Sequence, residues 1–158
     1  SEKAPKDIFK TAAGELSAFC LTIFMGGTPM IYSSQEIGYM EKINFFNYKI
    51  LSFVKAAGTQ IETRNAYATL LKAYQDTRDI RKGTKSAGAM DDKVPYVEYT
   101  QGESRLLVIC NHQNSAQIVT LPAAYQAAKV EDMKTGQEVT LASNLNLTAY
   151  EYRIFRKD

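Results

Sequence analysis

The chain has 158 residues, of which 45% are hydrophobic and 23% are charged, and its formal net charge is only +2 at pH 7. So small a charge excludes a strong polyelectrolyte partner, and we expect no nucleic-acid partner. The longest apolar stretch, residues 19–25, is much shorter than the roughly 20 residues that cross a bilayer, so we expect no membrane segment in this chain. No localisation is predicted.

Apolar side chains recur at helical spacing through residues 7–25, as at Ala12, Leu16, Phe19 and Ile23. This period predicts a helix that buries one face.

The segment that follows, residues 26–38, reads Gly-Gly-Thr-Pro-Met-Ile-Tyr-Ser-Ser-Gln-Glu-Ile-Gly. Pro29 cannot donate a hydrogen bond to a sheet, so it suits the first position of a strand. Met30, Ile31 and Tyr32 then predict a short strand buried on both faces, as in a parallel sheet. The polar residues beyond Tyr32 would lie past the carboxyl end of that strand.

A second helical period runs through residues 64–82 and stops at Gly83, a residue typical of helix ends. Residues 82–88 then predict a linker, because helical periods give way to short β-runs downstream. We therefore divide the chain into two domains, residues 1–83 and residues 84–158.

Short runs of β-forming residues separated by turns fill the second domain. Residues 94–100 and 105–111 flank a Gln-Gly-Glu-Ser turn and predict a hairpin. The further expected strands are residues 116–121, 129–133, 138–141 and 148–156. Five to seven short strands in this length are typical of a small antiparallel β-sandwich, so the predicted fold class is α+β.

Residues 26–38 resemble the segment around the eighth barrel strand of the α-amylase family of glycoside hydrolases, where a Gly-x-Pro…Tyr-x-Gly-x-Glu-x-Gly pattern recurs. The chain departs from this pattern at Ser34, where the family usually has glycine. Residues 42–46 and the expected closing strand, residues 147–155, are similar to other segments of the same family. The order and spacing of these pieces extend the resemblance across nearly the whole chain.

A complete (β/α)8 barrel, or TIM barrel, needs about 250 residues. The resemblance therefore implies a helical remnant of the last βα steps of the barrel, residues 1–83, followed by an all-β C-terminal domain, residues 84–158. The catalytic carboxylates of the family lie on strands four, five and seven, which would precede Ser1. The chain would then be the structural, non-catalytic C-terminal portion of a retaining α-glycosidase acting on α-glucans such as starch or maltooligosaccharides, with no catalytic residue and no cofactor.

Gln35 and Glu36 are the candidate substrate-binding residues, because they would lie at the barrel face where such enzymes build their sites. A structural interpretation is favoured, in which Glu36 bonds to the backbone of neighbouring loops and holds the barrel rim. Tyr32 and Tyr39 have the rings to stack on a sugar, but aromatic residues at strand ends more often pack against the protein.

Cys20 falls on a helical apolar face and Cys110 within a β-run, which favours two buried unpaired thiols over a disulfide. His112 follows a predicted strand and reads as a solvated turn residue. Two distant cysteines and one histidine do not make a zinc site, so we expect no metal.

Two other functions stay open. The chain is alternatively a non-catalytic carbohydrate-binding β-module, which a row of exposed aromatic residues on one sandwich face would favour, or an unrelated α+β interaction domain. A truncated barrel surface also leaves apolar faces without partners. We therefore expect the helices to fold back on the β-domain, on each other or on a second copy of the chain.

Overall fold

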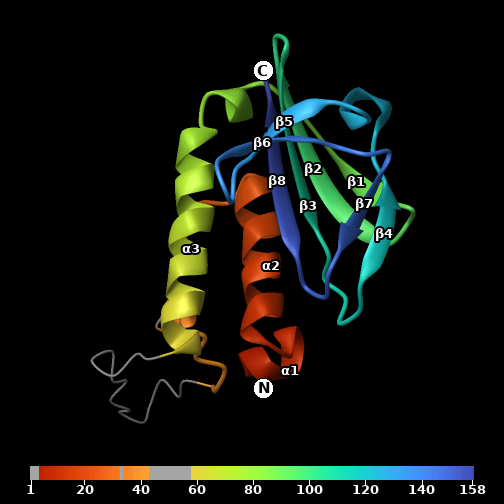
Figure 1. The fold of residues 1–158 in the computed structure, drawn as a ribbon. Coiled ribbons are helices and arrows are strands. Elements are labelled where there is room, and N and C mark those ends of the chain that lie inside the picture. Colours follow the sequence, from red (N-terminus) through yellow and green to blue (C-terminus); the bar gives the residue numbers. More distant parts are fainter. Residues whose placement is uncertain (1–3, 33, 43–57) are drawn as a thin grey trace.

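The computed structural model describes residues 4–32, 34–42 and 58–158. Within these ranges helices come first and antiparallel strands follow, which confirms the predicted α+β fold (Figure 1). The helical elements are α1 (Pro5–Phe9), α2 (Ala12–Phe24), α3 (Thr59–Asp76) and the 3-10 turns η1 (Gln35–Ile37), η2 (Ile80–Lys82) and η3 (Ala123–Tyr125). The strands are β1 (Thr84–Met90), β2 (Val94–Gln101), β3 (Ser104–Cys110), β4 (Gln117–Thr120), β5 (Lys129–Asp132), β6 (Gln137–Thr140), β7 (Asn144–Leu147) and β8 (Tyr152–Lys157).

The helix predicted over residues 7–25 is broken at Lys10 and Thr11 into α1 and α2. Lys10 has a φ of 65°, which a right-handed helix does not contain, and Thr11 is the N-cap of α2. The Thr11 hydroxyl accepts a hydrogen bond from the backbone N–H of Gly14 at 3.0 Å. The chain therefore turns before α2, and α1 is a short separate helix in contact with it.

The strand predicted at residues 30–32 does not form. The described residues 27–32 have no regular secondary structure, and Met30 is 74% exposed. A strand buried on both faces needs hydrogen-bonded neighbours on both sides, and none of the described strands pairs with this segment. Met30, Ile31 and Tyr32 instead form an exposed apolar strip.

α3 starts before the predicted residue 64, and η2 continues it as far as Lys82. The buried Thr77 ends α3 and donates its hydroxyl to the carbonyl of Tyr74 at 3.2 Å. The Arg81 guanidinium folds back over the Tyr74 ring, 3.5 Å from its centroid, and donates to the same carbonyl at 2.7 Å. These contacts hold the passage from the helices into the sheet.

All described strand pairs are antiparallel and form a six-stranded sheet of order β1-β2-β3-β8-β5-β6 and a two-stranded sheet of β4 and β7. The predicted hairpin is confirmed, with Gln101 of β2 opposite Ser104 of β3. The closing strand is shorter than predicted, because residues 148–151 form a turn between β7 and β8. Residues 82–88, predicted as a linker, mostly belong to β1, which pairs along its whole length with β2.

Two hydrophobic cores lie on opposite faces of the six-stranded sheet. α2 and α3 cover one face (Figure 1), and β4, β7 and η3 contribute to the core on the other. The first core packs Phe24 and Leu70 of the helices against Val108 of β3. The second packs Leu107 of the same strand against Tyr125 of η3. The two sheets form the predicted sandwich, and the helices fold back on it.

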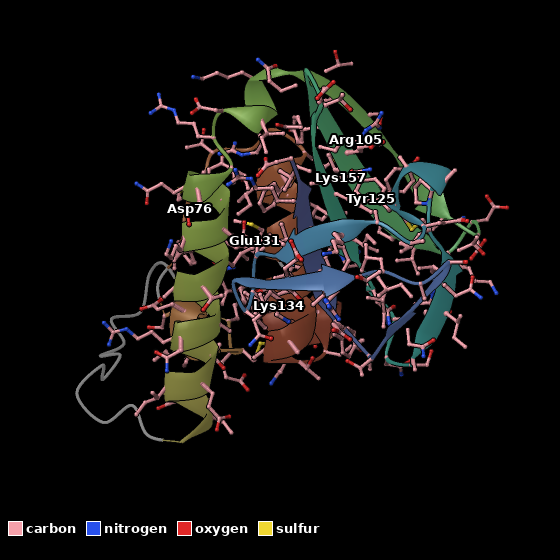
Figure 2. The ribbon with its side chains drawn as sticks, turned by 45° about the horizontal axis from the view of Figure 1, so that its top comes forward. Asp76, Arg105, Tyr125, Glu131, Lys134 and Lys157 are labelled. Atoms are coloured by element: carbon pink, nitrogen blue, oxygen red, sulfur yellow. The ribbon has the colours of Figure 1, made fainter. Side chains whose placement is uncertain are left out.

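A polar contact fastens η3 to the six-stranded sheet. The Tyr125 hydroxyl donates to the Glu98 carboxylate at 3.1 Å, and Arg105 pairs with the same oxygen at 3.1 Å. Burial raises the pKa of Tyr125, so the phenol stays a neutral donor. Figure 2 shows Arg105 and Tyr125 within the β half of the molecule and Asp76 on α3.

We expect Leu70→Ala to lower the free energy of unfolding by about 2–5 kcal/mol, because Leu70 is fully buried in the first core and its truncation leaves a cavity. Lys72→Ala on the same helix is the matched control. Its side chain is exposed and forms an ion pair with Asp76, so the change should stay below about 1 kcal/mol. Urea unfolding followed by circular dichroism measures both, and equal effects would contradict the shared core.

Candidate functional site

Gln35 and Glu36 lie on η1, which packs against α3, and Gly38, the residue after η1, lies between the N-terminal ends of α2 and α3. A Cβ atom at the position of Gly38 would be 3.1 Å from the Cβ of Ala12 in α2 and 3.7 Å from the Thr63 side chain in α3. The two predicted site residues therefore lie beside helices, whereas the prediction placed them at the end of a strand.

Both ends of η1 have left-handed backbone. Ser34 has a φ of 67° and Gly38 a φ of 71°. Glycine adopts this conformation freely and serine does not, so a glycine would fit the backbone of Ser34 with less strain. The turn forms nonetheless, and the N–H of Gly38 donates to the carbonyl of Gln35 at 2.9 Å.

The amide of Gln35 contacts the protein's own backbone. Its Oε1 accepts a hydrogen bond from the N–H of Tyr32 at 3.2 Å. Glu36 is half-buried, and its carboxylate accepts no hydrogen bond from the described residues. Gln35 thus has a structural contact, and substrate binding by either residue stays a prediction.

Buried oxygen atoms gather beneath η1. Glu15 and Tyr67 lie one helical turn beyond the residues of α2 and α3 that touch η1, and both are buried. One carboxylate oxygen of Glu15 and the hydroxyl of Ser34 have no hydrogen-bond partner among the described residues. The Tyr67 hydroxyl makes no hydrogen bond of good geometry there, but the Gln35 side chain is near enough to lower its pKa. Burying a charge without a partner is costly, so the neutral forms of Glu15 and Tyr67 are favoured here.

The pKa values of this cluster follow from burial. Glu15 is 6% exposed, and burial raises its pKa to about 7. Burial also raises the pKa of Tyr67, and the nearby Glu15 and Glu36 carboxylates raise it further. Sequence reasoning missed Glu15, although its position between Ala12 and Phe19 on the apolar face of the predicted helix was a usable signal.

Cys20 and Cys110 are free thiols with no exposed surface, which confirms the expected buried unpaired cysteines. Cys110 interacts with His112, and hydrogen bonding to Cys110 raises the pKa of the imidazole. His112 is exposed outside the strands, as predicted, and its Nε2 lies 3.3 Å from the carbonyl oxygen of Ser17 in α2. A cysteine nucleophile needs access to substrate, so the burial of Cys110 excludes a catalytic Cys–His pair at this place.

Within the described ranges, no group of three histidine, cysteine, aspartate or glutamate side chains is placed to hold a metal ion. None of the helices there is long and apolar enough to span a membrane.

Two neighbouring cavities lie where the helices meet the turns of the β half. One has a volume of 470 Å³ and lies between α1, α2 and residues 112–114. The other has a volume of 370 Å³ and lies between α2 and residues 148–152. Tyr150 lines both, and Glu151 is the one carboxylate among their lining residues. Neither cavity therefore holds the pair of carboxylates that glycoside hydrolysis uses.

The sequence matches no family model and no curated protein. Solved structures match the fold over most of the chain. An α-amylase from Lactobacillus plantarum has a TM-score of 0.73 at 11% identity, over 97% of this chain and 35% of that one. A noncanonic maltogenic α-amylase from Thermotoga neapolitana has a TM-score of 0.72 at 15% identity, over 92% and 36%. AmyP in complex with maltose has a TM-score of 0.70 at 14% identity, over 92% and 34%.

These similarities establish the fold. The chain folds like a part of an α-amylase, and it spans about a third of the length of these solved structures. The resemblance seen in the sequence is thus confirmed at the level of the fold.

We expect Glu15 to make the protein less stable as the pH rises from 4.5 to about 7. In this window the unfolded chain releases the Glu15 proton while the folded protein keeps it, so unfolding becomes more favourable with pH. The full effect above pH 7 is at most roughly 3 kcal/mol. Glu15→Gln should leave stability near pH 4.5 almost unchanged and flatten the fall.

Urea unfolding of both proteins at pH 5 and pH 8 measures this difference. Glu62→Gln is the control, because Glu62 is exposed on α3 and should keep the wild-type pH dependence. A Glu15→Gln variant as pH-dependent as the wild type would show that Glu15 ionises normally in the fold.

Proposed function

We propose that this chain is the C-terminal portion of an α-amylase-like glycoside hydrolase acting on α-glucans such as starch or maltooligosaccharides, and that the chain itself is structural and non-catalytic. The proposal rests on how much of this chain matches solved α-amylases. Solved α-amylases match more than nine-tenths of this chain with about a third of their own length. The maltose in the AmyP complex supports an α-glucan as the substrate of the parent enzyme.

On this proposal, residues 1–83 are the end of the catalytic barrel and residues 84–158 are its all-β C-terminal domain. The first core supports a structural role for the second part, because Phe24 and Leu70 are covered by the face of the six-stranded sheet. Burial of that apolar surface stabilises both parts together.

We expect the chain alone to release no reducing ends from maltoheptaose, since a glycosidase needs one carboxylate as acid and a second as base or nucleophile. The Lactobacillus plantarum α-amylase in the same assay is the positive control. The gene upstream of Ser1 should encode the missing catalytic carboxylates. Turnover by the purified chain, or an upstream sequence without such motifs, would overturn the proposal.

The alternative of a carbohydrate-binding β-module has less support. Tyr99 and Tyr152, two of the tyrosines at strand spacing, are buried in the first core. Among the large hydrophobic residues that are exposed in the described ranges, Tyr32 is the one aromatic, and it lies outside the sheets. The sandwich therefore presents no row of exposed aromatic side chains for a flat sugar-binding face.

We also propose that the apolar strip at residues 30–32 is a contact surface, covered in the parent enzyme by neighbouring barrel segments. In the chain by itself, such a strip favours self-association. Replacing Met30 and Ile31 together by serine should shift the chain towards the monomer. Light scattering at rising concentration measures this, and a wild-type chain that stays monomeric at millimolar concentration would contradict it.

A further inference from the structure

Tyr150 divides a groove into two halves. The cavities of 470 Å³ and 370 Å³ lie on either side of it, between the start of α2 and the turns that follow β3 and precede β8. Figure 1 shows these turns beside α1 and the first turn of α2. The volumes of these cavities lie within the range of small-ligand sites.

Asn111 fixes the two turns that form the floor of this groove, and it is fully buried. Its Nδ2 donates to the carbonyls of Ser115 at 2.8 Å and Thr148 at 2.7 Å. Its Oδ1 accepts from the N–H of Gln113 at 2.9 Å. The N–H of Tyr150 in turn donates to the carbonyl of Gln113 at 3.0 Å. The groove is therefore held in place before any ligand arrives, which lowers the entropic cost of binding.

Tyr150 has an unfavourable backbone conformation. Its φ is 58°, a left-handed value that bulky residues rarely adopt. The ring rests against α2 at Gly14, where an added Cβ would be 3.2 Å from the Tyr150 Cδ1 and 2.3 Å from the carbonyl oxygen of Phe9. Such strain persists where the surroundings enforce it, and it is common at ligand sites.

The lysines and the glutamate along the groove already have partners within the protein. The Lys134 ammonium lies over the Tyr152 ring, 4.5 Å from its centroid. Lys10 donates to the carbonyl of Asp7 at 2.8 Å. The Glu151 carboxylate accepts from the N–H of Thr148 at 2.8 Å and from its hydroxyl at 3.0 Å. In contrast, the side-chain amide of Asn114 has no hydrogen bond to the described residues. The side-chain amide of Asn114 is thus a neutral donor and acceptor that a ligand can use, beside the aromatic ring of Tyr150.

We infer that this groove binds a neutral oligosaccharide, with the Tyr150 ring stacking on one pyranose and the Asn114 amide bonding to its hydroxyls. An aromatic face matches the apolar face of a sugar ring, and amide groups both donate to and accept from hydroxyls. The choice of an α-glucan as this oligosaccharide rests on the proposed function. Because α1, α2 and the β turns all contribute, the site belongs to the combined unit and not to the β-domain alone.

Titration of the ¹⁵N-labelled full chain with maltoheptaose, followed by NMR, tests this inference. We expect saturable shifts at residues 112–114 and at Tyr150. Tyr150→Asn removes the ring but keeps a residue that tolerates left-handed backbone, so the fold should survive. It should weaken binding by about tenfold or more, whereas Tyr150→Phe should bind almost as the wild type does. Tyr32→Asn is the matched control, because it removes an exposed tyrosine elsewhere and should leave binding unchanged.

Binding that is lost in Tyr32→Asn and kept in Tyr150→Asn would overturn the inference, as would no binding at millimolar maltoheptaose. Shifts at residues 112–114 with inorganic phosphate but not with sugar would also overturn it, in favour of an anion site. A cellohexaose titration separates the two proposals. Equal binding of both sugars that depends on Tyr150 would support a saccharide-binding groove but contradict a preference for α-glucans. The search for catalytic carboxylates encoded upstream of Ser1 tests the proposed parent enzyme independently.

Discussion

Burial of β3 on both faces is the constraint on which the rest of the structure depends. Residues 106–110 of this strand are all buried, so their side chains need cover on each side of the sheet. β2 and β8 satisfy its backbone, α2 and α3 cover one face, and β4, β7 and η3 take part in the core on the other. The helices and the β half therefore share a core, and the domain boundary after residue 83 stays a prediction.

The end of β3 explains why the groove lies where it does. Asn111 follows the strand directly, and its buried amide can be satisfied only by the turns that lie beside it. Ser17 of α2 donates to the carbonyl of Asn111 at 3.3 Å and thereby connects the same point to the helix. The packing that closes the core thus also positions Tyr150 against Gly14. One buried residue serves stability and the shape of the groove at once.

The predictions from sequence succeeded where local signals and tertiary contacts agree. The β2–β3 hairpin has alternating β-formers around Gly102, whose φ of 63° suits a tight turn. β1 was missed because it contains Gly88 and short polar residues, and it forms as an edge strand paired with β2 alone. The prediction of a strand at residues 30–32 was wrong, because a strand buried on both faces needs neighbouring strands, and none of the described strands pairs with this segment. Tyr150 was predicted to lie within a strand but lies in a turn, and no local sequence pattern predicts its left-handed backbone.

The position of Gln35 and Glu36 does not depend on the strand that was predicted at residues 30–32 and does not form. η1 is held by Gly38 against α2 and α3, and by the contact of the Gln35 amide with the backbone of Tyr32. Gln35 therefore has a complete structural explanation, whereas Glu36 keeps a carboxylate that no described residue engages. Substrate binding by either residue therefore stays a prediction.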